Sequence, residues 1–356
     1  MKNTVVRELS NMASKGRVFL SMPWVPNLTP EILGRPGHYS EADTDEEIPR
    51  RHAILPMSQA SVSTLDHGGL YGDAVFEGIL IKNGQIFLFR EHIDRWWDSA
   101  AKLDIAMPYS KEELSWLLLE TIKQVGFSKD EKGYMRPVVS RGFGNLGINP
   151  AKCLAPTIYC IVSSIQLYPA EKYETGISLS ISRQIRRAGK DIEDPNIKSN
   201  NYLNNIGGLL ETRGRGTLET LMLTSRGNVA EATADNVFVI NKAEGWETDP
   251  SKVVLDTPSG DYCLRGITRN MVMDEAAKLG YQVRERGDML PIDFVGPDKE
   301  AFMTGTGCGL MPVVGVENVP VHDGEVGEIT KTLLGAVNRA MEDPSKGLSI
   351  DASRED

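Results

Sequence analysis

The sequence lacks any long apolar run, and this absence excludes one broad class of protein. Its 356 residues contain no stretch of about 18 consecutive apolar residues, the length that a transmembrane helix needs. Residues 1–20 also lack the continuous apolar segment and the small-residue cleavage site of a secretory signal peptide. We therefore expect a cytoplasmic protein that does not enter a membrane.

Cysteine and histidine are scarce, with four and five residues respectively. No two cysteines form a Cys-x-x-Cys pair, and no two histidines stand at the spacing of metal ligands. The sequence therefore predicts neither a disulfide framework nor a metal site, and it favours reduced thiols with structural roles. The four cysteines are Cys153, Cys160, Cys263 and Cys308.

Positively charged residues are fewer than negatively charged ones: the sequence has 39 Lys and Arg residues and 49 Asp and Glu residues, which gives a net charge of −10. An acidic surface repels the phosphates of nucleic acids and of anionic lipids, so neither is an expected partner. At roughly 100–200 residues per domain, the length of the chain favours two domains.

Several segments have a clear helical or strand pattern. Ser110 and Glu113 form a capping-box pattern, the apolar residues that follow repeat at helical spacing, and Gly126 ends them. Residues 156–165 form a continuous apolar stretch typical of a buried strand, and residues 177–182 alternate as a half-buried strand does. Further strands are predicted at 218–224, 236–240 and 301–304, and further helices near residue 91 and at 268–279 and 328–341.

Composition indicates where the domains begin and end. Residues 34–51 combine Pro, Gly and Ser with a run of acids, which predicts a mobile surface loop. Pro169 breaks the strand pattern, so we place a boundary near Leu167. The predicted organisation is a partly flexible N-terminal extension at 1–56, a small α/β domain at 57–166, an interdomain loop at 167–170, a large C-terminal domain at 171–342 and a disordered tail at 343–356.

Two polar residues stand at the ends of apolar segments, and each has two interpretations. Lys198 lies among amide side chains just before an apolar helix start; it is either a solvated surface lysine or an amine that forms a Schiff base with a carbonyl cofactor. Glu231 precedes an apolar strand and is either a turn residue or a buried carboxylate. The second role requires a buried cationic partner, because an unpaired buried charge is costly.

Two glycine-containing loops are of a size to bind phosphate. Gly266-Ile267-Thr268 opens a predicted helix, whose free N–H groups and positive dipole end favour an anion. The segment 304–309 follows a strand and can present successive amides to a ligand. A dinucleotide-binding fold is disfavoured, because no G-x-G-x-x-G motif is followed by an acid at the required distance. Cys308 has no histidine near it in the sequence, which favours a small buried residue over a catalytic nucleophile.

Seven motifs follow one another along the chain in the order of a known family. They are His67–Gly78, Arg90–Arg95, Tyr134–Pro137, Lys198–Tyr202, Glu231–Asn236, Leu264–Arg269 and Thr304–Gly307. Over residues 57–341 the chain resembles the fold-type IV pyridoxal-phosphate aminotransferases, and among them the branched-chain amino acid aminotransferases. The resemblance implies an α+β fold like that of D-amino acid aminotransferase, with two domains and the cofactor in the cleft between them. It also implies a homodimer or a higher homo-oligomer.

The same resemblance implies a role for each cofactor-binding residue. Lys198 would hold pyridoxal 5'-phosphate as a Schiff base and, once free, would act as the catalytic base at the substrate α-carbon. Tyr202 would donate to the phenolate oxygen of the ring, Glu231 would face the pyridine nitrogen and stabilise its protonated form, and Leu264 would pack on the ring face. The phosphate would bind to Arg95, Ile267, Thr268 and Thr306.

The substrate residues also come from the resemblance. Tyr71, Phe76 and Tyr134 would form an aromatic pocket that suits Leu, Ile and Val, and Arg136 would receive the distal carboxylate of glutamate. We therefore expect transfer of the amino group from L-branched-chain amino acids to 2-oxoglutarate. The α-carboxylate would bind to the amides of Gly307 and Cys308, which, with Gly309, replace the family's usual small-small-Glu segment.

Three alternative functions stay open. D-amino acid transaminases carry Arg-x-His after the corresponding Arg-Gly, whereas here Arg141-Gly142 is followed by Phe143, which argues against that branch. Tyr134 and Arg136 argue against both that branch and aminodeoxychorismate lyase. The third is a pyridoxal-phosphate-binding protein without turnover, and the presence of every candidate chemical group argues against it.

Overall fold

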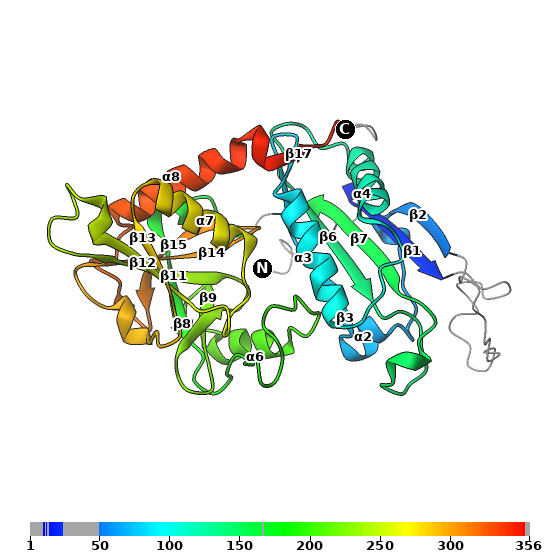
Figure 1. The fold of residues 1–356 in the computed structure, drawn as a ribbon, viewed down its shortest axis with the longest axis horizontal. Coiled ribbons are helices and arrows are strands. Elements are labelled where there is room, and N and C mark those ends of the chain that lie inside the picture. Colours follow the sequence, from blue (N-terminus) through cyan, green and yellow to red (C-terminus); the bar gives the residue numbers. More distant parts are fainter. Residues whose placement is uncertain (1–9, 11, 13, 24–49, 166, 353–356) are drawn as a thin grey trace. The chain divides into compact units, whose positions relative to one another are not determined.

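The computed structural model describes residues 10, 12, 14–23, 50–165 and 167–352, and the chain falls into two compact units (Figure 1). Unit 1 comprises Met1–Ile165, Lys198–Asn201 and Gly347–Asp356, and unit 2 comprises Gln166–Ile197 and Tyr202–Lys346. The chain therefore leaves unit 2 for four residues around Lys198, an excursion that the sequence did not predict. Among the described residues, no helix is long and apolar enough to cross a bilayer.

Unit 1 is built on an antiparallel sheet of eight strands. The strands run in the order β17-β5-β4-β6-β7-β1-β2, and β3 pairs with β6. Their bounds are β1 (Arg17–Pro23), β2 (Arg50–Pro56), β3 (Ala74–Phe76), β4 (Ile79–Lys82), β5 (Gln85–Phe87), β6 (Gly133–Ser140), β7 (Thr157–Ser164) and β17 (Gly347–Ser349).

Helices pack on this sheet (Figure 1). Helix α4 (Lys111–Val125) has the predicted capping box, because Ser110 Oγ accepts from the Glu113 amide at 3.1 Å and the Glu113 carboxylate accepts from the Ser110 amide at 3.0 Å. It ends at Gly126, whose φ of 71° suits glycine. The other described helices of unit 1 are α2 (His67–Tyr71), α3 (Phe89–Lys102), η1 (Met57–Gln59) and η2 (Pro150–Lys152).

Helix α3 fixes the position of β3. Trp96 on this helix is fully buried, and its indole N–H donates to the Val75 carbonyl at 3.2 Å. A large aromatic side chain that is buried, and whose N–H group has a hydrogen-bond acceptor, holds a helix firmly against a strand. Strand β3 carries Phe76, one of the predicted pocket residues, so this contact bears directly on the candidate site.

Unit 2 is built on a mixed sheet of nine strands. The order is β10-β9-β8-β15-β14-β11-β12-β13, with β16 paired to β15. Strand β8 lies parallel to both β9 and β15, β12 lies parallel to β13, and the other pairs are antiparallel. The bounds are β8 (Ile177–Ile181), β9 (Glu219–Leu223), β10 (Val229–Ala232), β11 (Asn236–Lys242), β12 (Val253–Pro258), β13 (Gln282–Arg286), β14 (Lys299–Gly305), β15 (Gly309–Val316) and β16 (Val319–Pro320).

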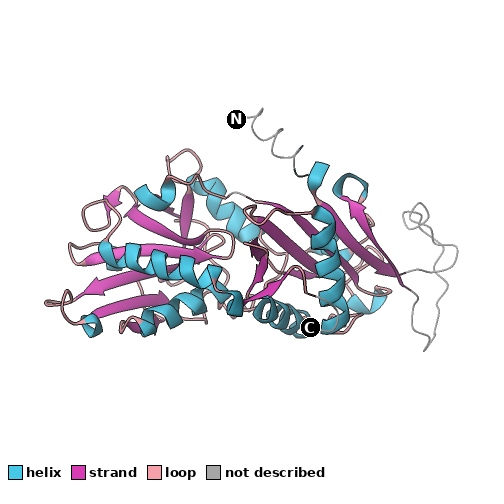
Figure 2. Cartoon of the chain, turned by 90° about the horizontal axis from the view of Figure 1, so that it is seen from above, coloured by secondary structure: helices cyan, strands magenta, loops and turns pink. Residues whose placement is uncertain are grey.

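Helices also pack against the sheet of unit 2 (Figure 2). Helices α7 and α8 contact each other and strand β14, and α6 contacts β9. Phe238 and Phe302, both fully buried, stack at a centroid distance of 4.8 Å in neighbouring strands of the sheet. The bounds are α5 (Lys172–Thr175), α6 (Leu203–Thr212), α7 (Ile267–Lys278), α8 (Glu328–Glu342), η3 (Pro250–Lys252), η4 (Pro291–Phe294) and η5 (Pro344–Lys346).

The predicted elements are found within one to three residues of their expected ends, but the C-terminal tail differs from prediction. Residues 347–349 were expected to be disordered, and they form β17, which pairs with β5 from Gly347 opposite Phe87 to Ser349 opposite Gln85. A short strand added to a sheet is held by backbone hydrogen bonds, which leave little pattern in the side chains. Of the loop predicted at 34–51, residues 34–49 lie outside the described residues, and 50–51 begin β2.

Candidate active site

Lys198 lies beside strand β3 in unit 1. The Phe76 amide donates to the Lys198 carbonyl at 2.9 Å, and Ser199 forms an isolated β-bridge with Val75. The Lys198 amide donates to Ser99 Oγ at 3.3 Å. The lysine side chain is half-buried, and its Nζ lies 4.6 Å from the centroid of the Phe76 ring. A half-buried lysine over an aromatic face is not a fully solvated surface side chain, and its role as a Schiff-base amine stays a prediction.

Arg136 on β6 shares the Phe76 ring with Lys198. Its guanidinium carbon is 4.5 Å from the Phe76 centroid and 5.4 Å from that of Tyr134, and one Nη donates to the Tyr134 hydroxyl at 3.3 Å. Arg136 Nε is buried and has no hydrogen-bond partner within the described residues. A Cβ at Gly78 would overlap the Tyr134 hydroxyl, so glycine is required there. Three of the predicted substrate residues therefore lie together with the lysine.

Tyr71, the remaining predicted pocket aromatic, makes different contacts. It ends helix α2, its hydroxyl donates to the Leu146 carbonyl, and its ring meets that of His67 edge-on at 5.0 Å. The hydroxyl and the ring of Tyr71 are therefore engaged with Leu146 and His67. Its role in a substrate pocket stays a prediction.

Arg95, a predicted phosphate ligand, pairs with a buried carboxylate in unit 1. Its Nε donates to Glu77 Oε1 at 2.6 Å and its Nη2 donates to Glu77 Oε2 at 2.8 Å. His92, one turn earlier on α3, lies 2.7 Å from Glu77 Oε2 through Nδ1. Burial alone would raise the pKa of Glu77, but Arg95 and His92 hold it well below its ordinary value. Burial lowers the pKa of His92, so the imidazole is neutral and its Nδ1–H donates to Glu77.

Replacing Glu77 by glutamine is expected to destabilise unit 1, because Arg95 then loses the buried carboxylate to which it donates two hydrogen bonds. We expect the free energy of unfolding at pH 7 to fall by about 3–5 kcal/mol. Since the folded-state pKa lies below the ordinary 4.5, the contribution of Glu77 is fully present above that value and is lost as the pH falls below it. Urea unfolding from pH 3 to 7 should therefore show a weaker loss of stability with acid in Glu77→Gln than in the wild type.

The matched control is Glu120→Gln on α4. Glu120 forms a surface pair with Lys123 at 3.1 Å, and its side chain is 33% exposed. This change should cost less than about 0.5 kcal/mol at any of these pH values. An equal effect of the two substitutions would contradict the role given to Glu77.

Glu231 on β10 is the buried carboxylate of unit 2, and it has the cationic partner that burial requires. Arg187 Nε donates to Glu231 Oε1 at 2.7 Å. The other oxygen accepts from the Leu264 amide at 3.2 Å and lies 3.5 Å from Asn236 Nδ2. Glu231 is only 6% exposed, so it is not an ordinary turn residue. The arrangement, a buried carboxylate bound to a guanidinium and to an amide, suits a group that faces a cationic ligand group.

Tyr202 and Leu264 also belong to the surroundings of Glu231 in unit 2. Tyr202 is the N-cap residue of α6 and lies close enough to Arg187 to act on its pKa. Burial would lower the pKa of Arg187, but Glu231 and Tyr202 raise it above its ordinary value. Leu264 is half-buried and is held through both backbone groups, because its carbonyl also accepts from Asn236 Nδ2 at 2.8 Å.

Thr268 is the best candidate in unit 2 for an anion ligand. It is 2% exposed, it lies in the first turn of the twelve-residue helix α7, and its hydroxyl has no hydrogen-bond partner in the described part of the chain. A buried hydroxyl and the free N–H groups of a helix start together match the oxygens of a phosphate. The preceding residue, Ile267, is also buried. A Cβ at Gly266 would overlap Asn236 Oδ1, so glycine lets the start of α7 lie directly against Asn236. The Asn236 side chain also contacts Glu231.

Thr306, Gly307 and Cys308 lie in the turn between β14 and β15. Thr306 and Gly307 are half-buried, whereas Cys308 is 4% exposed. Burial and the neighbouring Asp235 raise the pKa of the Cys308 thiol well above its ordinary value. A thiol that resists ionisation is a poor nucleophile, so the structural interpretation of Cys308 is favoured over the catalytic one.

Sequence reasoning missed four side chains that support these residues: Glu77, His92, Arg187 and Asn236. Glu77 could have been found as an acid within an apolar run, and His92 by its helical spacing from Arg95. Nothing in the sequence around Arg187 indicates a buried partner for Glu231. Within the described residues, no group of three or more His, Cys, Asp or Glu side chains could hold a metal ion.

Comparison with known proteins gives a consistent family. The family model described as amino-transferase class IV matches residues 74–316. A Methanocaldococcus jannaschii protein, whose name assigns it to the branched-chain-amino-acid aminotransferases, is 38% identical over 280 residues, which are 79% of this chain and 91% of that protein. The D-alanine aminotransferase of Listeria monocytogenes is 30% identical over 291 residues, with 79% and 91% covered.

A solved structure of a similar protein contains a ligand with a phosphopyridoxyl group. The T.th. branched-chain amino acid aminotransferase, complexed with N-(5'-phosphopyridoxyl)-L-glutamate, superposes with a TM-score of 0.74 at 27% identity. The match covers 84% of this chain and 96% of that chain. The ligand in that structure joins a phosphopyridoxyl group to an amino acid, and so contains both a phosphate and two carboxylates.

Proposed function

We propose, because the chain belongs to the class IV aminotransferases, that it transfers the amino group of L-leucine, L-isoleucine or L-valine to 2-oxoglutarate. The enzymes of this family use pyridoxal phosphate. The observation that best supports this substrate pair is the single ring of Phe76, which has the Lys198 amine at 4.6 Å and the Arg136 guanidinium at 4.5 Å. An aromatic wall suits a branched side chain, and the cation beside it suits the second carboxylate of glutamate.

Lys198 is the proposed catalytic residue. When bound, pyridoxal phosphate supplies an aldehyde that takes up the amino group and a ring that withdraws electrons from the α-carbon. Lys198 would hold the cofactor covalently in the resting enzyme and, once its amine is free, would move the proton from the α-carbon. Its backbone hydrogen bonds to Phe76 and Ser99 would keep the start of the lysine side chain in one place through both steps.

The residues of unit 2 fit the phosphate and the ring of this cofactor. The Thr268 hydroxyl, which has no hydrogen-bond partner in the described part of the chain, and the N–H groups at the start of α7 would donate to the phosphate oxygens, and Ile267 and Thr306 would contribute. Arg95, which belongs to unit 1 and binds Glu77 there, stays a prediction as a phosphate ligand. Glu231, paired with Arg187, would keep a proton on the pyridine nitrogen. The Tyr202 hydroxyl would bind the ring oxygen and Leu264 would cover the ring face.

The substrate carboxylates would meet two different groups. The amides of Gly307 and Cys308 would bind the α-carboxylate that every amino acid carries. Arg136 would bind the distal carboxylate that only glutamate and 2-oxoglutarate carry, because its buried Nε lacks a partner among the described residues and a carboxylate would supply one. Tyr71, Phe76 and Tyr134 would contact the branched side chain. The homodimer and the cytoplasmic location stay predictions.

Replacing Arg136 by glutamine is expected to lower the activity with L-glutamate much more than the activity with L-leucine. A charge-assisted contact is worth about 1.5–3 kcal/mol, so kcat/KM for L-glutamate should fall by about 10–100-fold. The value for L-leucine should change by less than about threefold, since leucine has no distal carboxylate. Single-turnover rates with each amino acid measure both numbers.

Arg90→Gln provides the matched control, because Arg90 is an exposed arginine on α3 and the same chemical change is made there. It should leave the rates with both amino acids as in the wild type. Equal losses for leucine and glutamate in Arg136→Gln would show that Arg136 does not discriminate by the distal carboxylate.

Donor profiling of the purified protein loaded with pyridoxal phosphate tests the proposed function. We expect L-leucine, L-isoleucine and L-valine to convert the visible absorption of the bound cofactor to that of the amine form, and 2-oxoglutarate to restore it. The Listeria relative makes a D-specific enzyme the second candidate. Conversion by D-alanine without conversion by L-leucine would overturn the proposal in favour of that candidate.

A further inference from the structure

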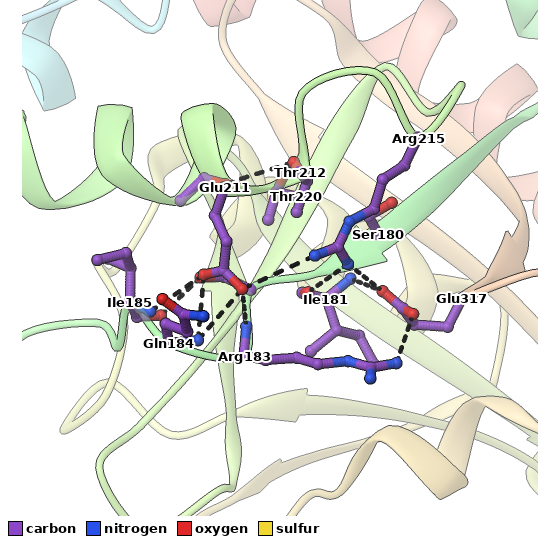
Figure 3. Close-up of polar contacts among 12 residues, drawn as sticks. Ser180, Ile181, Arg183, Gln184, Ile185, Glu211, Thr212, Arg215, Thr220 and Glu317 are labelled. Carbon is purple, nitrogen blue, oxygen red and sulfur yellow. Dashed lines mark hydrogen bonds and ion pairs between the residues drawn. The ribbon is translucent and has the colours of Figure 1, made fainter.

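A carboxylate at the end of helix α6 organises the segment that carries Arg187. Glu211 accepts a hydrogen bond from the Ser182 hydroxyl at 2.6 Å and from the successive amides of Arg183, Gln184 and Ile185 at 2.8, 3.1 and 3.1 Å (Figure 3). An acid in the last turn of a helix is disfavoured by the helix dipole, so its presence there has to be offset. Three converging N–H groups supply that offset.

Asn204, on the same helix, holds the other end of the segment 182–188. Its Nδ2 donates to the Arg186 carbonyl at 2.7 Å, and its Oδ1 accepts from the Ala188 amide at 3.3 Å. Between these two contacts the Arg187 amide donates to the Leu223 carbonyl of β9 at 2.9 Å. The backbone of Arg187 is therefore fixed on both sides by α6 and in the middle by the sheet.

The Arg187 side chain depends on this fixed backbone. It reaches Glu231 through Nε at 2.7 Å, and its side chain is 13% exposed. A displacement of the backbone by an ångström would break a hydrogen bond of this length. Glu231 would then be a buried carboxylate without its cation, which is strongly disfavoured.

We propose that Glu211 is a positioning residue for Glu231, acting through the segment 182–188 and Arg187. The inference rests on the proposed function, in which Glu231 faces the cofactor ring. Within the described residues, Glu211 forms no hydrogen bond or ion pair with Arg187 or Glu231, and its effect is transmitted by the amides that it binds. These amides and the Ser182 hydroxyl also outweigh the effect of burial and lower the pKa of Glu211 to about 2, so the carboxylate is ionised at every pH at which the enzyme would work.

The test compares Glu211→Gln with Glu317→Gln. Glu317 loses the same charge in the same cluster, but it binds the Ile181 amide and the side chains of Arg183 and Arg215 instead of the three amides (Figure 3). In the cofactor-free protein, Glu211→Gln should speed amide hydrogen exchange in residues 183–188 by about tenfold or more, since at least one to two hydrogen bonds are lost. Glu317→Gln should leave exchange in 183–188 within about twofold of the wild type.

Titration with pyridoxal phosphate supplies the second readout. Glu211→Gln should weaken cofactor binding by about tenfold, and Glu317→Gln should not. If Glu211 acts through Arg187, the double variant Glu211→Gln, Arg187→Gln should bind the cofactor no more weakly than Arg187→Gln alone. Wild-type exchange and affinity in Glu211→Gln, or losses that add in full in the double variant, would overturn the inference.

The same titration on Glu231→Gln separates this inference from the proposed function. Normal cofactor affinity and an unchanged visible spectrum in Glu231→Gln would contradict the proposed contact between Glu231 and the cofactor ring. Fast exchange in 183–188 of Glu211→Gln would still support the positioning of Arg187. Weak binding by Glu231→Gln together with wild-type behaviour of Glu211→Gln would contradict the positioning role alone.

Discussion

Lys198→Ala is expected to lower the rate of the half-reaction with L-leucine by about 10²–10⁴-fold, the usual contribution of a well-placed general base. If Lys198 has the proposed role, the variant loses both the covalent attachment of the cofactor and the amine that moves the α-proton. Because the backbone contacts of Lys198 with Phe76 and Ser99 do not need its side chain, the fold of unit 1 should be retained. Stopped-flow absorbance with leucine measures the rate, and urea unfolding checks the fold.

Two controls distinguish a chemical role from a structural one. Lys190→Ala removes a lysine from the same connecting segment, where the side chain is 67% exposed and lies 3.8 Å from Asp261, and it should leave the rate unchanged. A small amine such as methylamine should restore part of the rate in Lys198→Ala, because it can accept the proton that the lysine no longer takes. A variant that keeps more than a tenth of the wild-type rate would rule out Lys198 as the base.

Glu231→Gln is expected to lower the same rate by about 10²–10³-fold, corresponding to about 3–4 kcal/mol. The glutamine keeps the shape of the side chain but removes the carboxylate that pairs with Arg187. In the proposed arrangement it would also no longer hold a proton on the pyridine nitrogen. The rate of α-proton removal should fall more than the affinity for leucine, because the protonated ring matters most when negative charge develops at the α-carbon. The single-turnover rate and its dependence on leucine concentration separate the two.

Glu300→Gln is the matched control for that change. Glu300 is 2% exposed and pairs with Lys242 at 3.1 Å in the same unit, and it also accepts from the Thr330 amide at 2.7 Å. Its replacement should lower the free energy of unfolding as Glu231→Gln does, yet leave the rate with leucine unchanged. If both variants lose activity equally, the loss reflects stability and not the ring nitrogen.

Elements that depend on local interactions could be predicted from the sequence. The capping box of Ser110 and Glu113 and the glycine at 126 fix the ends of α4 by contacts within a few residues, and the structure confirms both ends. The strands β1, β2 and β17 could not be predicted, because each is defined by pairing with a distant part of the chain. Periodicity does not contain that long-range information.

The candidate site shows the same division between local pattern and long-range contact. The sequence indicated that Glu231 needs a buried cation, since that requirement follows from burial alone, but it did not identify Arg187. The excursion of Lys198 into unit 1 depends on its backbone bonds to β3, which is far earlier in the chain. The motifs therefore predicted the candidate reactive groups, while the supporting side chains became visible only in the folded structure.

Borohydride reduction of the pyridoxal-phosphate-loaded protein, followed by digestion and mass spectrometry, tests the central claim most directly. Reduction fixes the cofactor to the amine that holds it, and we predict a single phosphopyridoxyl group on the peptide that contains Lys198. A tag on any other lysine, or no tag on a protein that has bound the cofactor, would contradict the account.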